Sequence, residues 1–332
     1  KNLKFLNFGK LRASYGLTGG DQIGDYAYLT QWSFQGNSRY NSINPIVPIQ
    51  HTDSTLQWQV NKKLEISLAL GFFNDRITIE ANWYRHRCNN QLVNFPLPSY
   101  TGFSEVVSNS PANVQNTGIE LMVNAKIIST NDFNWSLKFN ISQNRNKLLS
   151  YPNFSQSPYV NQFTIGKSLN IIKRLHYIGV DPQTGYYQFE DLNKDGEIKI
   201  DLSGKTADDR YDLDRSVKFD GGLNNALAYK RWELNFLFYF RKQIGANAFA
   251  SYNTPGSISN ISQEVFYNHW QKPGDIAKYA KFTTDGSSDP SYQNFYTYSD
   301  GIYTDASYIR LKNLSLSYTL PEAVNKKAMM KA

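Results

Sequence analysis

The sequence predicts an all-β protein, an antiparallel transmembrane β-barrel fragment with about eight long strands in an open, curved sheet and long loops on one side. Three observations support this prediction. Apolar and polar residues alternate over segments of about ten residues, the length that a tilted strand needs to cross a bilayer. Short and long connections between these segments alternate along the chain, as they do in transmembrane barrels. No apolar run reaches about eighteen residues, which excludes a transmembrane helix.

The alternation is clearest between residues 63 and 85, where two long strands flank the turn-forming pair Asn74 and Asp75 and predict a hairpin. One strand precedes this hairpin, two further hairpins follow it, and a single strand comes last. These strands are expected at residues 3–16, 119–127, 135–142, 223–229, 232–241 and 307–320. In the last strand the apolar phase slips, which predicts a bulge near Lys312 and Asn313.

The connections differ in length in a regular way. The links after the second, fourth and sixth strands are a few residues long, whereas the other links run to tens of residues. Because the long links contain glycine and proline, we expect irregular structure at residues 17–55, 95–113 and 148–215, and in about sixty residues before the last strand. A barrel with short turns on one side of the membrane and long loops on the other explains this asymmetry.

The two faces of the predicted strands differ in polarity. Leu, Ile, Val, Phe and Trp occupy one face, whereas Glu, Lys, Asn and Ser occupy the other, which suits a lipid exterior and a water-filled interior. The residues expected on the convex, lipid-facing surface are Ile66, Leu121, Phe139 and Phe236. Trp83, Trp135 and Trp232 are expected to face lipid near the interfaces. A soluble sandwich would show the same alternation with its apolar face inward, but strand length and loop asymmetry favour the barrel.

Composition and motifs argue against several functional classes. The net charge is +7, but Lys and Arg are spread along the chain rather than clustered with aromatic residues, so we expect no nucleic-acid partner. Cys88 is the single cysteine, so no disulfide forms within the chain. The four histidines are isolated, and no nucleophile elbow or complete phosphate-binding loop is present. We therefore expect no enzymatic activity.

Several segments resemble the SusC/RagA type of TonB-dependent outer-membrane transporter. Residues 11–16 (LRASYG) resemble that family's L-R-x-S-Y-G strand, and residues 116–120 (NTGIE) resemble its N-x-G-I-E strand start. Residues 191–198 (DLNKDGEI), followed by residues 208–210 (DDR), resemble its acidic loop. The most specific match is at residues 306–321 (ASYIRLKNLSLSYTLP), which is close to the family's Y-I-R-L-K-N-x-S-L-x-Y-x-L-P. The resemblance covers nearly the whole chain.

This resemblance implies both a fold and a function. Such transporters form a plugged barrel of about 22 strands in the bacterial outer membrane. A SusD-like surface lipoprotein caps them, and they import oligosaccharides or peptides with energy from the TonB-ExbB-ExbD complex. We therefore expect residues 1–332 to be one part of the barrel domain, with the plug, the TonB contact and the closing strands absent. The expected partners are outer-membrane lipid, the lipoprotein and a glycan or peptide substrate.

One loop carries part of a calcium-binding pattern. Asp191, Asn193, Asp195 and Gly196 fit positions one, three, five and six of a calcium loop, but Leu202 replaces the glutamate expected at position twelve. Two interpretations remain open: a solvated turn closed by Asx hydrogen bonds, or a weak Ca²⁺ site. The ligands of that calcium site would be Asp191, Asn193, Asp195, Glu197 through its carbonyl group, and Asp201.

Aromatic residues in the loops are the candidate substrate-binding residues, because flat rings stack on sugar faces. The candidates are Trp32, Tyr40, Tyr100, Phe103, Trp270 and Tyr292. Two other functions remain as alternatives to nutrient import. The first is a secreted all-β carbohydrate-binding or adhesive protein, and the second is a β-rich glycosidase, although the sequence cannot supply the carboxylate separation that a glycosidase requires.

Overall fold

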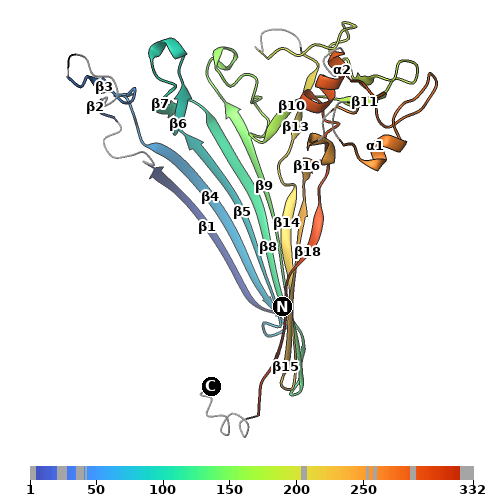
Figure 1. The fold of residues 1–332 in the computed structure, drawn as a ribbon. Coiled ribbons are helices and arrows are strands. Elements are labelled where there is room, and N and C mark those ends of the chain that lie inside the picture. The colour runs from blue at the N-terminus through green and yellow to red at the C-terminus, as the bar shows by residue number, and fades with distance from the viewer. Residues whose placement is uncertain are drawn as a thin grey trace.

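The main feature of the computed structural model is one antiparallel sheet of eight long strands (Figure 1). The structure describes residues 5–20, 28–34, 41, 43–202, 208–251, 254–256, 260–284 and 289–321. The eight strands are β1 (Leu6–Gly20), β4 (Gln59–Phe72), β5 (Ile77–Asn89), β8 (Asn113–Ser129), β9 (Phe133–Ser150), β14 (Phe219–Tyr229), β15 (Trp232–Lys242) and β18 (Tyr308–Tyr318). Each strand is paired with the preceding one, with β1 and β18 at the two edges. The prediction of about eight long antiparallel strands is therefore confirmed.

Tight turns and long connections lie at opposite ends of this sheet (Figure 1). Tight turns join β4 to β5, β8 to β9 and β14 to β15. The first turn matches the predicted pair, because Asn74 and Asp75 both adopt positive φ, the left-handed conformation that Asn and Asp tolerate best among residues with side chains. The predicted alternation of short and long links is thus the actual organisation of the sheet.

The last strand contains the predicted bulge. In the pairing of β15 with β18, Leu237 faces Asn313 and the next residue, Phe238, faces Leu311. Lys312 is therefore the extra residue on β18. The bulge restores the apolar residues on both sides of it to one face of the sheet, which explains the phase slip seen in the sequence.

The long connections contain more regular structure than the sequence predicted. Five two-stranded sheets form there: β2 (Trp32–Phe34) with β3 (Ile46–Pro48), β6 (Gln91–Pro96) with β7 (Glu105–Ser110), β10 (Ile171–Leu175) with β13 (Arg210–Asp214), β11 (Tyr177–Val180) with β12 (Tyr187–Phe189), and β16 (Ile244–Ala246) with β17 (Tyr303–Asp305). The short helical elements are η1 (Ser99–Thr101), η2 (Phe154–Gln156), η3 (Ala248–Ser251), α1 (Gln263–Tyr267), α2 (Pro290–Gln293) and η4 (Asn294–Tyr298). The expectation of irregular links was wrong at these places, because strands of three to six residues are too short to show a clear period of two.

Buried hydrophobic clusters lie at the loop end of the molecule rather than against the middle of the sheet. One cluster consists of residues of the long connections, and a smaller one forms where Ala112, Val114 and Leu148 meet the connection after β9. The four apolar residues expected to face lipid belong to neither cluster: Ile66 is exposed, and Leu121, Phe139 and Phe236 are half-buried. Within the described residues, no second layer of protein covers them. No helix in the described ranges has the length and apolarity needed to span a bilayer.

Candidate functional site

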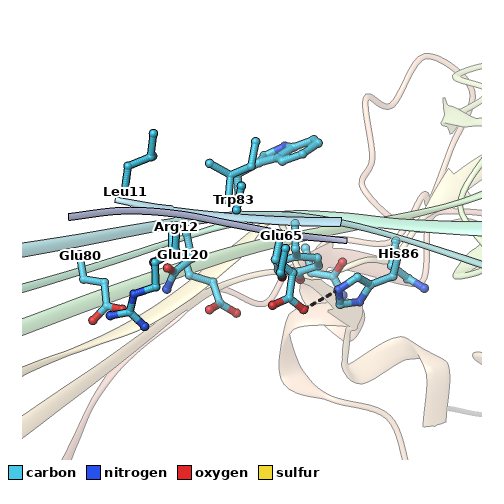
Figure 2. Close-up of a pocket in the computed structure, with 15 residues that line it drawn as sticks. Leu11, Arg12, Glu65, Glu80, Trp83, His86 and Glu120 are labelled. Carbon is cyan, nitrogen blue, oxygen red and sulfur yellow. Dashed lines mark hydrogen bonds and ion pairs between the residues drawn. The ribbon is translucent and has the colours of Figure 1, made fainter. Parts of the chain in front are cut away.

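The register of the sheet places apolar side chains from all eight strands on one face. A single cross-strand row contains Leu11, Leu68, Ala81, Leu121, Ile141, Gly221, Phe240 and Ile309. Figure 2 shows Leu11 and Trp83 on this side of the sheet, and Arg12, Glu65 and Glu120 on the other side. Because side chains alternate along every strand, the apolar face continues across the whole sheet.

Asn225 is a polar residue on this apolar face, at the centre of β14, and its side chain is hydrogen-bonded. Asn225 is buried, and the Nε1 of Trp135 on the neighbouring strand donates to its Oδ1 at 3.2 Å. An unpaired amide in hydrocarbon would cost several kcal/mol. Trp135 thus has two functions here, since its ring adds apolar surface and its N–H satisfies Asn225.

The opposite face of the sheet is polar across all eight strands. The row next to the one above contains Arg12, Ser67, Asn82, Glu120, Ser142, Asp220, Arg241 and Tyr308. An open hollow of about 1080 Å³ lies on this face, and its polar lining includes Arg12, Glu65, Glu80, His86 and Glu120 (Figure 2). His86 and Glu65 interact there through Nε2 and Oε1 at 3.1 Å. This surface can contact water and polar solutes.

A glycine in the polar face explains one of the sequence motifs. Gly118 faces Tyr84 across the β5–β8 pair, and a Cβ atom at Gly118 would lie 2.4 Å from the Tyr84 ring. Only a residue without a side chain lets the tyrosine ring lie flat over the sheet at this point. The glycine of the motif at residues 116–120 therefore has a packing function on the polar side.

The long connections after β9 and after β15 pack together into one unit, which we call the loop cap (the described residues of 171–214 and 243–306). Its core contains Leu175, Val180, Tyr187, Phe189, Ala280, Tyr292, Phe295 and Ile302. The rings of Tyr187 and Phe295, one from each connection, are stacked with their centroids 4.0 Å apart. Such aromatic pairs add to the stabilisation that comes from burial alone.

Asp300 joins the two halves of the loop cap by hydrogen bonds. Its Oδ2 accepts from the hydroxyl of Tyr211 at 2.8 Å and lies 2.7 Å from Nδ1 of His176, while its Oδ1 accepts from the backbone N–H of Tyr177 at 2.8 Å. Burial, together with the hydrogen bond to Asp300, raises the pKa of Tyr211. The side chain of Asp300 thus fixes one connection against the other.

The structure places the predicted aromatic residues in different environments. Trp32 is exposed and Tyr100 is 88% exposed, so both offer open ring faces. Phe103 is half-buried and packs edge-on against His51, with the ring centroids 5.9 Å apart. Tyr40 lies outside the described residues. Trp32 lies on the connection after β1, whereas Tyr100 and Phe103 lie on the connection after β5, and the described contacts do not gather the three rings into one site.

Two of the predicted aromatic residues belong to the loop cap. Trp270 packs against its core, and its Nε1 donates to the carbonyl oxygen of Pro182 at 2.8 Å. Tyr292 is only 1% exposed, and its hydroxyl donates to the carbonyl oxygen of Lys281 at 2.7 Å. The expectation that Tyr292 offers its ring to a substrate is therefore wrong, because the core covers both ring faces.

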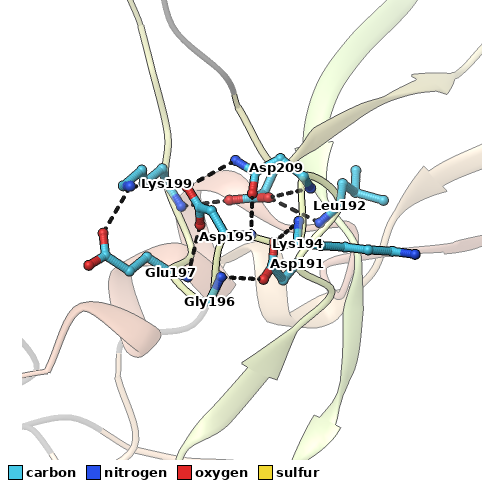
Figure 3. Close-up of polar contacts among 9 residues, drawn as sticks. Asp191, Leu192, Lys194, Asp195, Gly196, Glu197, Lys199 and Asp209 are labelled. Atoms are coloured by element: carbon cyan, nitrogen blue, oxygen red, sulfur yellow. Dashed lines mark hydrogen bonds and ion pairs between the residues drawn. The ribbon is translucent and has the colours of Figure 1, made fainter.

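The acidic loop is closed by its own hydrogen bonds (Figure 3). The carboxylate of Asp191 accepts from the N–H groups of Lys194 and Gly196 at 2.6 and 2.8 Å. Asn193 Oδ1 accepts from the N–H of Asp195, whose own Oδ1 accepts from the N–H of Glu197. These are the Asx bonds of the turn interpretation, and the hydrogen bond from Glu197 is the main reason that the pKa of Asp195 is lowered.

Lys199 occupies the side of the loop where a cation would bind. Its ammonium group pairs with the carboxylates of Asp195 and Glu197 at 3.0 and 2.9 Å. The backbone oxygen of Asp201 accepts from Arg210 at 2.8 Å. Within the described ranges, no three acidic, cysteine or histidine side chains converge as metal ligands. In this arrangement Lys199 and backbone N–H groups engage carboxylate oxygens of Asp191 and Asp195 that a calcium site would use.

Asp209 is a structural residue of this loop, which the sequence analysis quoted only as part of the segment 208–210. It is fully buried (0% exposed), and its carboxylate accepts from the backbone N–H groups of Leu192, Asn193 and Lys199. It therefore supports the loop from behind (Figure 3). Its sequence signal was the pair of acids at residues 208–209, but local pattern cannot show which of the two is buried.

Comparisons with known proteins agree with this fold. No protein-family model matches the chain. TonB-dependent receptor P3 of Formosa agariphila is 28% identical over 347 residues, covering 95% of this chain and 32% of that receptor. TonB-dependent receptor SusC of Bacteroides thetaiotaomicron is 25% identical, covering 96% of this chain and 32% of that receptor. A solved structure of the RagAB peptide transporter superposes with a TM-score of 0.79 at 22% identity, covering 98% of this chain and 36% of that one.

The chain is similar to SusC/RagA-type TonB-dependent receptors over nearly its whole length. It spans about a third of the length of the curated receptors that it matches. The family resemblance seen in the sequence and the all-β barrel fragment that it implied are both confirmed. In a barrel segment of this kind, an apolar face is typical of the exterior and a polar face is typical of the lumen side.

Proposed function

We propose that the full-length protein imports a large nutrient across the bacterial outer membrane with energy from TonB, and that this chain forms part of the barrel wall. The observation that carries the proposal is the separation of polarity across the sheet, apolar on one face and polar on the other over all eight strands. A wall of this kind isolates polar solutes from the hydrocarbon of the membrane. The relatives named TonB-dependent receptors support the energy source.

We propose an oligosaccharide or a peptide as the nutrient and a SusD-like surface lipoprotein as the partner above the loop cap. The similar proteins include one named SusC and one described as a peptide transporter, which favours these two classes of substrate. Among the described residues, the exposed rings of Trp32 and Tyr100 at the loop end are two of the surfaces on which a sugar could stack. The TonB-ExbB-ExbD complex would act through other parts of the full-length protein.

Site-directed spin labelling of the reconstituted full-length protein tests the proposed wall. Glu120 and Leu121 are neighbours on β8 whose side chains point to opposite faces. After Cys88→Ala, a label at Leu121→Cys is expected to be relaxed mainly by oxygen, which partitions into lipid. A label at Glu120→Cys is expected to be relaxed mainly by a water-soluble nickel chelate.

Equal exposure of both labels to the nickel chelate, in a protein that stays soluble without detergent, contradicts the wall and favours a secreted carbohydrate-binding protein.

The substrate is tested separately, by deleting the gene and growing the host on defined oligosaccharides or on defined peptides as sole nutrient. Loss of growth on one class and not the other identifies the substrate class.

A further inference from the structure

The lipid-facing side of the sheet becomes basic at its loop end. Above the apolar rows, the next two rows of the same face read Tyr15, Leu64, Arg85, Thr117, Arg145 and then Leu17, Lys62, Arg87, Gln115, Lys147. Arg85 and Arg87 follow Trp83 at alternate positions on β5, so they share the side on which Figure 2 shows Trp83. Within these two rows, Lys62, Arg85, Arg87 and Lys147 form what we call the basic patch.

The cations of the basic patch face each other without an acid between them. Lys62 lies directly opposite Arg87 in the β4–β5 pair, a juxtaposition of like charges that destabilises a sheet. The ion pairs found among the described residues do not include any of the four cations. The nearest acids on these strands, Glu65 and Glu120, point to the polar face (Figure 2). The patch therefore has a net positive charge that the described residues do not neutralise.

Two contacts show that the patch is ordered at its edges. The Nε of Arg87 donates to Oε1 of Gln115 at 2.8 Å, which leaves its two terminal amino groups available. Arg145, in the row below Lys147, donates instead to the carbonyl oxygens of Val217 and Lys218. Arg145 is therefore a structural residue, whereas Lys62, Arg87 and Lys147 are exposed to an external ligand.

The position of the patch identifies the kind of ligand. It begins one row above Trp83, where the apolar surface ends, so it lies at the height of lipid headgroups. The same face ends at the turn side in a row of aromatic residues, Phe133, Tyr229, Trp232 and Tyr318, where Lys230 lies over the ring of Tyr229. Guanidinium and ammonium groups in a cluster recognise phosphate. The cluster of four cations at the loop end is thus matched to an anionic headgroup.

We propose that Lys62, Arg85, Arg87 and Lys147 bind the phosphorylated headgroup of a lipid in the leaflet at the loop end, with its acyl chains against the apolar rows below. The inference rests on the proposed function, because it requires the sheet to be a membrane wall. The bound phosphates take the place of the missing acidic partners and relieve the repulsion between Lys62 and Arg87. The lipid thereby stabilises the rim on which the loops stand.

The test compares lipid capture by variants of the full-length protein in phosphatidylcholine nanodiscs that contain a small fraction of bisphosphorylated lipid A. Lys62→Ala with Arg87→Ala is expected to reduce the lipid A retained, measured by native mass spectrometry, by about twenty-five-fold, since each cation near an anionic surface contributes a factor of about five. The control, Lys10→Ala with Lys63→Ala, removes the same charge from the polar face of β1 and β4 and is expected to retain lipid A normally. Lys62→Arg with Arg87→Lys keeps the charge and is expected to retain most of it.

Each remaining outcome has a definite meaning. Equal loss in the patch variant and in the control, or no loss in either, overturns the inference. Equal capture of lipid A and of its dephosphorylated form also overturns it. Release of lipid A by excess inorganic phosphate shows a site for free anions and contradicts the lipid assignment. A full-length protein that inserts into nanodiscs but fails these tests leaves the proposed function intact, whereas a protein that does not insert overturns both.

Discussion

The loop cap and the eight-stranded sheet satisfy their apolar residues in opposite ways. In the cap, Leu175, Tyr292 and Phe295 are almost completely buried against other parts of the chain. On the sheet, Ile119 lies on an interior strand and is still 55% exposed, within a face that is apolar across all eight strands. The cap is thus stabilised as a soluble domain is, by burial from water, whereas under the proposed function lipid covers the apolar face of the sheet. One chain would then meet two solvents.

The largest expected effect is loss of packing in the cap. Leu175→Ala removes a fully buried side chain from the core and is expected to cost about 2–5 kcal/mol of cap stability. Hydrogen exchange on the full-length protein should show lower protection in β10, β13 and the residues around Asp300. Ile178→Ala, at an exposed position two residues after His176, is the control and should change protection by an order of magnitude less.

The matching experiment on the sheet places a charge on the apolar face. Phe139→Arg is expected to lower the free energy of unfolding of the reconstituted full-length protein by about 2–4 kcal/mol, because an arginine would then meet hydrocarbon near the middle of the apolar rows. Denaturant unfolding from vesicles measures this difference. Ser142→Arg, on the same strand but beside Asp220 on the polar face, should be tolerated. Equal effects of the two variants contradict the comparison between the faces.

A smaller effect is expected from the link between the two connections of the cap. Asp300→Asn removes the charge that the hydroxyl of Tyr211 and the ring of His176 contact, and is expected to cost about 1–3 kcal/mol. Tyr211→Phe removes one of these hydrogen bonds and should cost less. Limited proteolysis of the full-length protein, followed in both connections, measures the result. Unchanged cleavage in both variants means that the core alone holds the connections together.

A pH dependence is expected at the junction of β15 with the cap. Hydrogen bonds from the side chain of Lys242, and from the side chain and backbone N–H of Ser307, lower the pKa of Asp305 from 3.8 to about 2. Because the folded pKa is depressed, the stabilisation is complete above pH 3.8 and is lost as the pH falls through about 2. Asp305→Asn should abolish this acid dependence. Hydrogen exchange in β16 and β17, followed from pH 3.8 down to about 2, measures this acid dependence. An identical loss of protection in the Asp305→Asn variant contradicts the prediction.

The smallest expected effect concerns calcium at the acidic loop. Since Lys199 and backbone N–H groups already engage the oxygens of Asp191 and Asp195, we expect no heat of binding up to about 1 mM calcium in calorimetry. Lys199→Ala removes the ammonium group that pairs with the carboxylates of Asp195 and Glu197. Calcium binding by this variant is therefore compared with binding by the unmodified protein. Binding of calcium by the unmodified protein would show that the loop rearranges around the ion, and would support the calcium interpretation.

Local pattern was sufficient for the sheet. The hairpin turn at Asn74 and Asp75 and the bulge at Lys312 could both be predicted, because side-chain alternation, turn conformation and a slip in phase are properties of neighbouring residues. The same signal was too weak for the short strands of the cap. It also could not separate Trp32, which is exposed, from Tyr292, which is buried, since both are aromatic residues in long connections.

By itself, the sequence determined which segments are long strands and that each has one apolar and one polar face, because these depend on a repeat of two residues. Only the tertiary structure decided how the connections after β9 and β15 pack together through Asp300, and how Asp209 supports the acidic loop. These features depend on contacts between residues distant in the chain, which register and packing bring together and which no local pattern encodes.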